Sequence, residues 1–227
     1  MALIILIFAA LLLLGPQLWA RYVIAKHSKD RRDLPGTGGE LAKHLLTASG
    51  LNDYSVQLDT LSRGDHFDPV NRTIVLRPNH YKKRSLSAAV VAAHEFGHAI
   101  QLQIGYRPLL LRSRLVVAAA GAERLASVLL LMTPIVSIIA KTPIAGVGVL
   151  AFGIAIMTLP ILVHLVTLPV EFDASFKRAL PVLRNGYLGN SDLKDARTIL
   201  LACSLTYVAA SLASLLNFWR WLRFIRR

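Results

Sequence analysis

Long apolar runs separated by short polar stretches constrain this chain more than any other feature. Residues 1–20 carry no charged side chain, and further apolar runs extend from about 115 to 140, 144 to 170 and 198 to 218. About 20 apolar residues in a helix cross the hydrocarbon core of a bilayer, so each run is a candidate span. Only 17% of the 227 residues are charged and 54% are hydrophobic, which excludes a disordered chain. The sequence therefore predicts a mostly α-helical membrane protein with a small polar part.

The net charge of +13 is concentrated beside the apolar runs. Residues 21–114 carry 15 basic and 8 acidic side chains, whereas residues 115–170 carry two and one. Basic residues after the first span predict an N-terminus outside and a polar part in the cytoplasm. A cleaved signal peptide is the alternative for residues 1–20, but no basic residue precedes Arg21, which favours an uncleaved anchor. We expect a lipid bilayer as partner and no nucleic acid, since no nucleic-acid motif accompanies the charge.

The pattern divides the chain into five parts. We predict a transmembrane anchor at 1–20, a cytoplasmic α+β part at 21–114, a transmembrane helical hairpin at 115–170 turning at 141–143, a cytoplasmic segment at 171–197, and an apolar helix with a basic tail at 198–227. Four arginines end the chain, and a span at 198–218 would carry them outside. That last run is therefore expected either to span or to lie in the interface.

Within the polar part, periodicity predicts a few short elements. They are a helix at 40–49, strands at 54–58 and 72–77 with a loop at 65–69 between them, and a helix from Ser85 or Ser87 to about Gln103. The strand at 72–77 is interpreted either as an edge strand that pairs with an extended peptide or as an ordinary half-buried strand.

Residues 94–98 read HEFGH within the last of these helices. His94 and His98 stand four residues apart, so they share one face and can both bind a single Zn²⁺ ion. Glu95 can then take a proton from metal-activated water. Gly97 would let another element approach closely at this face. The alternative is a pair of ordinary helix histidines.

A catalytic zinc ion needs a third protein ligand and one open position. A hairpin returns the chain to the side it left, so Glu171, directly after the hairpin, is the favoured ligand. The other candidates are Glu123, Asp173, Asp65 and His66.

Three blocks of sequence resemble a known family. They read DHFDPVNRTIVL at 65–76, LSAAVVAAHEFGHAIQ at 86–101 and LPVEFDAS at 168–175. Together they resemble the YugP-like, membrane-associated neutral zinc metallopeptidases, over most of the chain from the anchor to at least residue 175. More remotely, the chain is similar to the HtpX and CAAX prenyl proteases, which share an HExxH helix, a later glutamate ligand in an E-x-x-x-D pattern and a metal next to membrane helices.

The resemblance implies a zincin-like cytoplasmic part whose HExxH helix packs beside a transmembrane helical hairpin. It implies one Zn²⁺ per chain with Glu171 as third ligand. Ser175 stands where the remote pattern has aspartate, so Asp173 is our candidate for orienting the histidines. His66, in the first resembling block, is our candidate for stabilising the transition state, and a surface-loop histidine is the alternative.

These observations predict an integral-membrane zinc-dependent endopeptidase in the bacterial inner (cytoplasmic) membrane, multi-pass, with its active site facing the cytoplasm. Its substrate would be a peptide or a membrane protein, hydrolysed by metal-activated water with Glu95 as general base. One alternative is a zinc-binding but proteolytically inactive membrane scaffold or chaperone-like protein. Another is a basic membrane-surface binding module in which HExxH is incidental. The pattern predicts neither the substrate sequence nor the oligomeric state.

Overall fold

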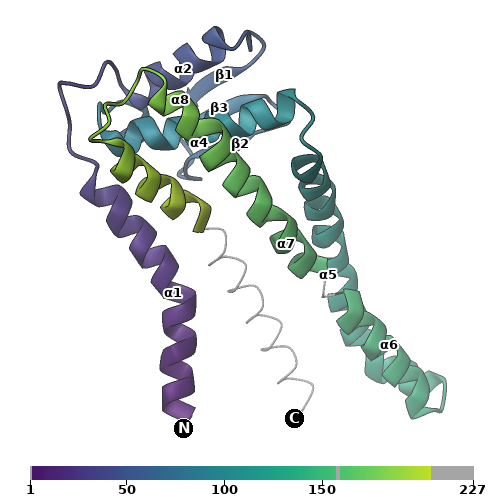
Figure 1. The fold of residues 1–227 in the computed structure, drawn as a ribbon. Helices are drawn as coiled ribbons and strands as arrows, with labels where there is room; N and C mark the ends of the chain where they lie inside the picture. Colours follow the sequence, from purple (N-terminus) through teal and green to yellow (C-terminus); the bar gives the residue numbers. More distant parts are fainter. Residues whose placement is uncertain (1, 157–158, 206–227) are drawn as a thin grey trace. The chain divides into compact units, whose positions relative to one another are not determined.

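The computed structural model describes residues 2–156 and 159–205, and these are mostly helical with one three-stranded sheet (Figure 1). The chain forms two compact units. Of the described residues, the first unit contains 2–106 and 168–205, and the second contains 107–156 and 159–167. The segments 21–114 and 171–197 were predicted as separate parts. In the structure, residues 21–106 and 171–197 belong to the same unit, whereas residues 107–114 belong to the second unit.

Two helices open the first unit: α1 (Ala2–Lys26) and α2 (Gly38–Ala48). Helix α2 begins at a capping box, in which Thr37 Oγ1 accepts a hydrogen bond from the Glu40 backbone and Glu40 Oε2 accepts one from the Thr37 backbone. Gly38 lies against neighbouring backbone, since a Cβ there would stand 2.3 Å from the His80 carbonyl oxygen. The helix predicted at 40–49 is confirmed and packs closely on the elements that follow.

The sheet corrects two predictions. Its strands are β1 (Ser55–Leu58), β2 (His66–Asp68) and β3 (Thr73–Leu76), in the order β1-β3-β2. Strand β3 pairs in parallel with β1 and antiparallel with β2, so it is central and the edge-strand interpretation was wrong.

The predicted loop at 65–69 was also wrong, because residues 66–68 form β2. Asp68 accepts hydrogen bonds from the backbone N–H groups of Val70 and Asn71, which folds the chain back onto β3. A three-residue strand that ends at an aspartate and is followed by a proline carries too little alternation to be recognised from sequence.

Helix α4 (Leu86–Gln103) follows the short α3 (Pro78–Tyr81) and forms the centre of the first unit. Ser85 caps it, with its hydroxyl accepting from the Ala88 N–H at 3.2 Å. Fifteen of its 18 residues are buried, so protein covers it on every side rather than on one face. Gly105, with a φ of 65°, follows its end.

The chain re-enters the first unit along α7 (Leu159–Phe172), which continues as the π-helical turn η1 (Asp173–Ala179) and then α8 (Leu180–Arg184). Residues 193–205 are also helical. The turn η1 packs against α4 at Gly97, where a Cβ would lie 2.5 Å from the Ala174 carbonyl oxygen. The close approach predicted at Gly97 is thus confirmed.

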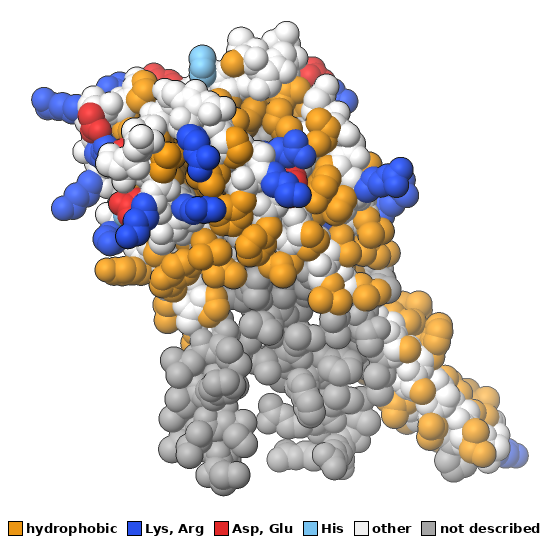
Figure 2. Space-filling model, viewed as in Figure 1, with side chains coloured by type: hydrophobic (Ala, Val, Ile, Leu, Met, Phe, Trp, Pro, Cys, Tyr) orange, Lys and Arg blue, Asp and Glu red, His pale blue; other side chains and the backbone are white. Residues whose placement is uncertain are grey.

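The second unit contains a helical hairpin of α5 (Arg107–Ile139) and α6 (Pro143–Ile156). Its turn includes Lys141 in the left-handed region (φ 52°), within the predicted turn at 141–143. Large apolar side chains are exposed along α6, and Figure 2 shows hydrophobic side chains over the surface of this hairpin.

Among the described helices, none is by itself both long and apolar enough to cross a membrane. One pair, 107–126 with 131–139, passes that test together, with a bend of 50° between its parts. The predicted spans stay predictions, as does the packing of the HExxH helix beside the hairpin. Most of the run 198–218 lies outside the described residues.

Candidate metal centre

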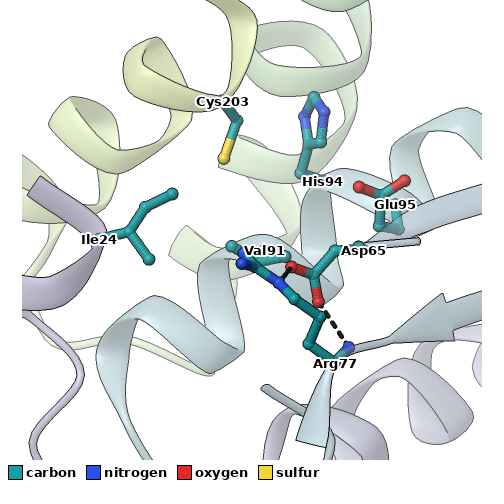
Figure 3. A pocket seen from close by; sticks show the side chains of 8 residues that line it. Ile24, Asp65, Arg77, Val91, His94, Glu95 and Cys203 are labelled. Atoms are coloured by element: carbon teal, nitrogen blue, oxygen red, sulfur yellow. Dashed lines mark hydrogen bonds and ion pairs between the residues drawn. The ribbon is translucent and has the colours of Figure 1, made fainter. Parts of the chain in front are cut away.

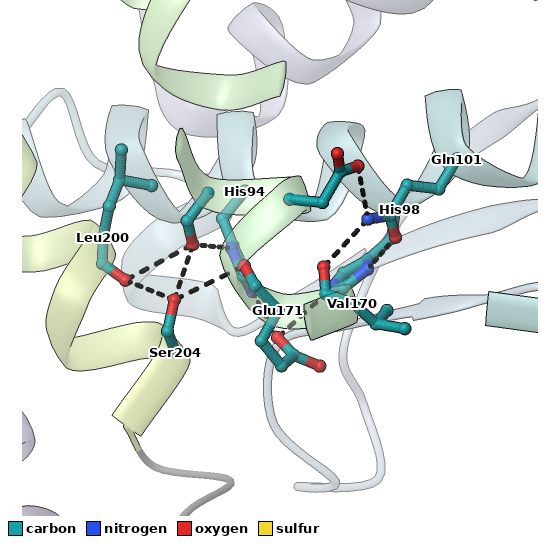
Figure 4. Close-up of polar contacts among 9 residues, drawn as sticks. His94, His98, Gln101, Val170, Glu171, Leu200 and Ser204 are labelled. Carbon is teal, nitrogen blue, oxygen red and sulfur yellow. Dashed lines mark hydrogen bonds and ion pairs between the residues drawn. The ribbon is translucent and has the colours of Figure 1, made fainter. Parts of the chain in front are cut away.

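His94 and His98 lie one turn apart on α4, and both rings face the junction of α7 with η1 (Figure 4). Their ring centroids are 4.8 Å apart. Glu171, near the end of α7, meets them, with its Oε2 atom 3.3 Å from the Nε2 atom of each histidine. All three side chains are buried, and their candidate ligand atoms lie within 4.8 Å of one another.

This donor set fits a zinc ion. Two ligand atoms at about 2.0–2.1 Å from a tetrahedral zinc centre lie roughly 3.4 Å apart. The distances from Glu171 Oε2 to the Nε2 atoms of the two histidines, 3.3 Å each, match this ligand-to-ligand separation. Two imidazoles and one carboxylate also leave the fourth position open, as catalytic zinc sites do. His94, His98 and Glu171 could therefore hold one metal ion.

The ring of His94 is oriented by a chain of hydroxyl groups. Its Nδ1 atom is 2.9 Å from Ser175 Oγ, which in turn lies 2.9 Å from Ser204 Oγ. Ser204 also donates to the Leu200 carbonyl at 3.0 Å. Both hydroxyl groups can donate hydrogen bonds to the Leu200 carbonyl oxygen. Ser175 Oγ is therefore free to accept a hydrogen bond from the His94 Nδ1–H, which leaves His94 Nε2 facing Glu171.

The ring of His98 is oriented by an amide. Its Nδ1 atom is 3.0 Å from Gln101 Oε1. The Gln101 amide nitrogen donates to the Val170 carbonyl at 2.8 Å and to Asp173 Oδ2 at 2.9 Å. Two acceptors at the nitrogen fix the direction of the amide, so its oxygen must face His98. The Nδ1 atom of His98 then carries the hydrogen, and Nε2 faces Glu171.

Charges within the site are strongly coupled. Burial alone would lower the pKa of His98, but the negative charge and hydrogen bond of Glu171 outweigh it and raise that pKa to about 9. Burial alone would raise the pKa of Glu171, but the two histidines outweigh it and lower that pKa. A buried carboxylate thus stabilises positive charge at the point where the two Nε2 atoms converge.

Glu95 lies in the wall of a cavity of about 260 Å³ that His94 also lines (Figure 3). Burial raises the pKa of Glu95, and the charges of His94 and His98 offset this only in part. A carboxylate with a raised pKa, next to the candidate metal ligands, is suited to accept and return a proton.

The remaining predicted residues lie around this centre. Asp173 contacts Gln101 rather than a histidine ring, and Ser175, at the position of the missing aspartate, contacts His94. Asp65 lines the cavity but binds Arg77 and His80. Burial alone would raise its pKa, but the hydrogen bond and charge of His80 and the charge of Arg77 lower it.

His66 is half-buried on β2, and its Nδ1 atom lies 2.8 Å from the Gly64 carbonyl oxygen. It is not among the residues that line the cavity, and its predicted role stays a prediction. The side chain of Glu123 lies outside those that the structure describes.

Sequence reasoning missed Gln101 and Ser204. Gln101 follows His98 by three residues on the same helix, and that spacing alone places the two side chains side by side. Ser204 lies 33 residues after Glu171 and reaches the site only through the packing of residues 193–205, so no local signal marks it.

The two histidines of the HExxH helix and a glutamate from a later helix form a donor set that could hold one metal ion, as in the class of HExxH zinc peptidases. A family model described as "Putative neutral zinc metallopeptidase" matches residues 2–226, and the chain belongs to this family. It is also 34% identical over 218 residues to the "Putative membrane protease YugP" of Bacillus subtilis, covering 94% of this chain and 93% of that relative. No solved structure matches the chain. The predicted family resemblance and the predicted zinc cofactor are confirmed.

Proposed function

We propose that this chain is an integral-membrane, zinc-dependent endopeptidase that hydrolyses peptide bonds with Glu95 as general base. The observation that carries the proposal is the convergence of His94, His98 and Glu171 directly beside the cavity that Glu95 lines. An inactive scaffold would need the three metal-binding side chains, but it would have no use for a buried carboxylate beside them.

The residues would divide the chemistry as follows. His94, His98 and Glu171 would hold the zinc ion, which when bound acts as a Lewis acid toward a carbonyl group and lowers the pKa of water. Glu95 accepts the proton of the attacking water and returns it to the leaving amine. Ser175 and Gln101 keep the two imidazole rings in the tautomer that presents Nε2 to the site.

We further propose that the protein is a multi-pass protein of the cytoplasmic membrane whose site faces the cytoplasm and acts on peptides or membrane proteins. Three observations support this: the long apolar runs, the basic residues that follow the first of them, and the exposed apolar side chains of α5 and α6. The relative from Bacillus subtilis is also named a putative membrane protease.

The test compares wild type with Glu95→Gln, both purified in detergent and loaded with zinc. We expect about one zinc ion per chain in both proteins, since Glu95 is not among the three converging ligands. Cleavage of a peptide library, read by mass spectrometry, should fall about 10²–10⁴-fold in the variant, as expected for loss of a general base. Equal cleavage by both proteins would refute the proposed role of Glu95. Zinc binding without any cleavage by wild type would favour the inactive scaffold.

A further inference from the structure

The cavity beside Glu95 has one apolar wall and one polar wall (Figure 3). Ile24 from α1, Val91 from α4 and Cys203 from the helical residues 193–205 form the apolar wall. Asp65 and Arg77 lie on the polar wall with the two residues of the HExxH motif. Three segments far apart in sequence thus build one hydrophobic surface next to the proposed catalytic group.

The charged pair on the polar wall is already neutralised. Asp65 Oδ1 accepts the Arg77 backbone N–H at 2.8 Å, and Asp65 Oδ2 accepts Arg77 Nε at 2.6 Å. The same Oδ2 atom is 2.8 Å from His80 Nδ1. A charged ligand side chain in the cavity would lose its hydration and find these charges engaged with each other, which disfavours it relative to an apolar one.

The wall supplied by α1 is fixed to the rest of the first unit. Ala20 and Val23, which precede the cavity-lining Ile24 on α1, are buried. The His27 carbonyl accepts a hydrogen bond from the Ser87 N–H at 3.1 Å. Farther along, Arg31 binds both carboxylate oxygens of Asp192 at 2.8 and 2.9 Å. The end of α1 is therefore part of the folded unit, and Ile24 keeps its place at the cavity.

The size of the cavity selects among apolar ligands. An apolar cavity of about 150 Å³ accommodates a benzene-sized group, whereas sites for whole small molecules begin at about 300 Å³. At about 260 Å³, this cavity suits one large side chain. Because His94 and Glu95 line it, that side chain would belong to a residue next to the bond that is cleaved.

We propose that this cavity is a specificity pocket for one large apolar side chain of the substrate, such as leucine or phenylalanine, and that Ile24 sets its size. The inference rests on the proposed peptidase function and adds a substrate class to it. It also gives α1, the helix that contains most of the predicted anchor, a direct part in substrate choice.

The test measures binding as well as cleavage. Peptide hydroxamates, which bind zinc, are made with Leu, Phe, Ala, Glu or Lys beside the hydroxamate and titrated calorimetrically into zinc-loaded, full-length protein in detergent. We expect the Leu and Phe probes to bind wild type at least about 10-fold more tightly than the Ala, Glu and Lys probes. Ile24→Trp should abolish that preference, and Ile24→Ala should shift it from Leu toward Phe. Zinc content and circular dichroism verify that each variant is folded.

Leu18→Trp is the matched control, because it adds a similar ring at a position on α1 that is 60% exposed and does not line the cavity. It should leave the preference unchanged. Equal binding of the Leu and Ala probes, tighter binding of the Glu or Lys probe, or equal effects of Leu18→Trp and Ile24→Trp would overturn the inference. Cleavage of peptides with the same residues is measured in parallel. A preserved Leu preference in binding with no hydrolysis would refute the peptidase proposal and leave the pocket assignment standing.

Discussion

Helix α4 in the first unit and helix α6 in the second are both rich in apolar residues, but they differ in what covers them. In α4, protein buries apolar and polar side chains alike, and Phe96 is 2% exposed. In α6, Ile144 is 81% exposed and Phe152 is 59% exposed. Apolar surface of that extent is stable only when something removes it from water, which is the role we propose for the bilayer. Apolar composition therefore does not distinguish a buried core helix from a proposed membrane helix. What distinguishes them is whether protein covers their side chains.

The largest expected effect is the loss of zinc binding when the side chain of Glu171 is removed. Glu171→Ala should weaken zinc binding by more than about 100-fold, since loss of groups that merely orient metal ligands already costs 10–100-fold. Metal content after dialysis against a zinc buffer measures it. Glu40→Ala is the control, because it removes a carboxylate of the α2 capping box in the same unit. Zinc retained by Glu171→Ala would refute our assignment of the third ligand.

The second prediction compares the same substitution, phenylalanine to alanine, at a buried position on α4 and at an exposed position on α6. Phe96→Ala should destabilise the protein by about 3–5 kcal/mol, because it empties a buried position in α4. Phe152→Ala should change stability by less than about 0.5 kcal/mol, because its exposed ring contributes little to the packing of the protein. Thermal unfolding in detergent gives both values. Similar losses in the two variants would mean that protein, rather than lipid or detergent, covers α6.

Local signals made α4 and its motif predictable from sequence. A serine cap, a long apolar run and a terminating glycine give its limits, and the spacing within HExxH places both histidines on one face. Glu171 required one further step, the return of the chain after a hairpin. The resemblance of the surrounding sequence to a known family added independent support for it.

The remaining features depend on tertiary packing. Strand β2 is defined by its pairing with β3, not by its own three residues. Ser175 and Ser204 meet because η1 and residues 193–205 both pack near α4, and neither residue type predicts such a contact. The apolar wall of the cavity brings together Ile24, Val91 and Cys203, which no sequence pattern links.

The third prediction concerns how closely each region is packed against its neighbours. Gly97→Ala would place a Cβ 2.5 Å from the Ala174 carbonyl oxygen, so η1 must move, at a cost of about 3 kcal/mol. Gly121→Ala on α5 meets no atom within 4 Å and should be neutral or stabilise the helix by up to about 1 kcal/mol. Thermal unfolding and zinc content are measured together. A Gly97→Ala protein as stable as wild type would show that η1 does not pack as closely as described.

The smallest expected effect is a difference in zinc affinity between two glutamine variants of α4, one at a buried position and one at the exposed end of the helix. Gln101→Ala removes the acceptor at His98 Nδ1 and the two hydrogen bonds to Val170 and Asp173, so the ring is no longer held in one tautomer. We expect zinc affinity to fall about 10–100-fold, as for other groups that orient metal ligands. Gln103→Ala, two residues later and exposed, should leave zinc affinity unchanged. Competition with a chromogenic zinc chelator gives both constants. Equal affinities in the two variants would show that burial of His98, without its amide partner, is enough to present Nε2 to the metal.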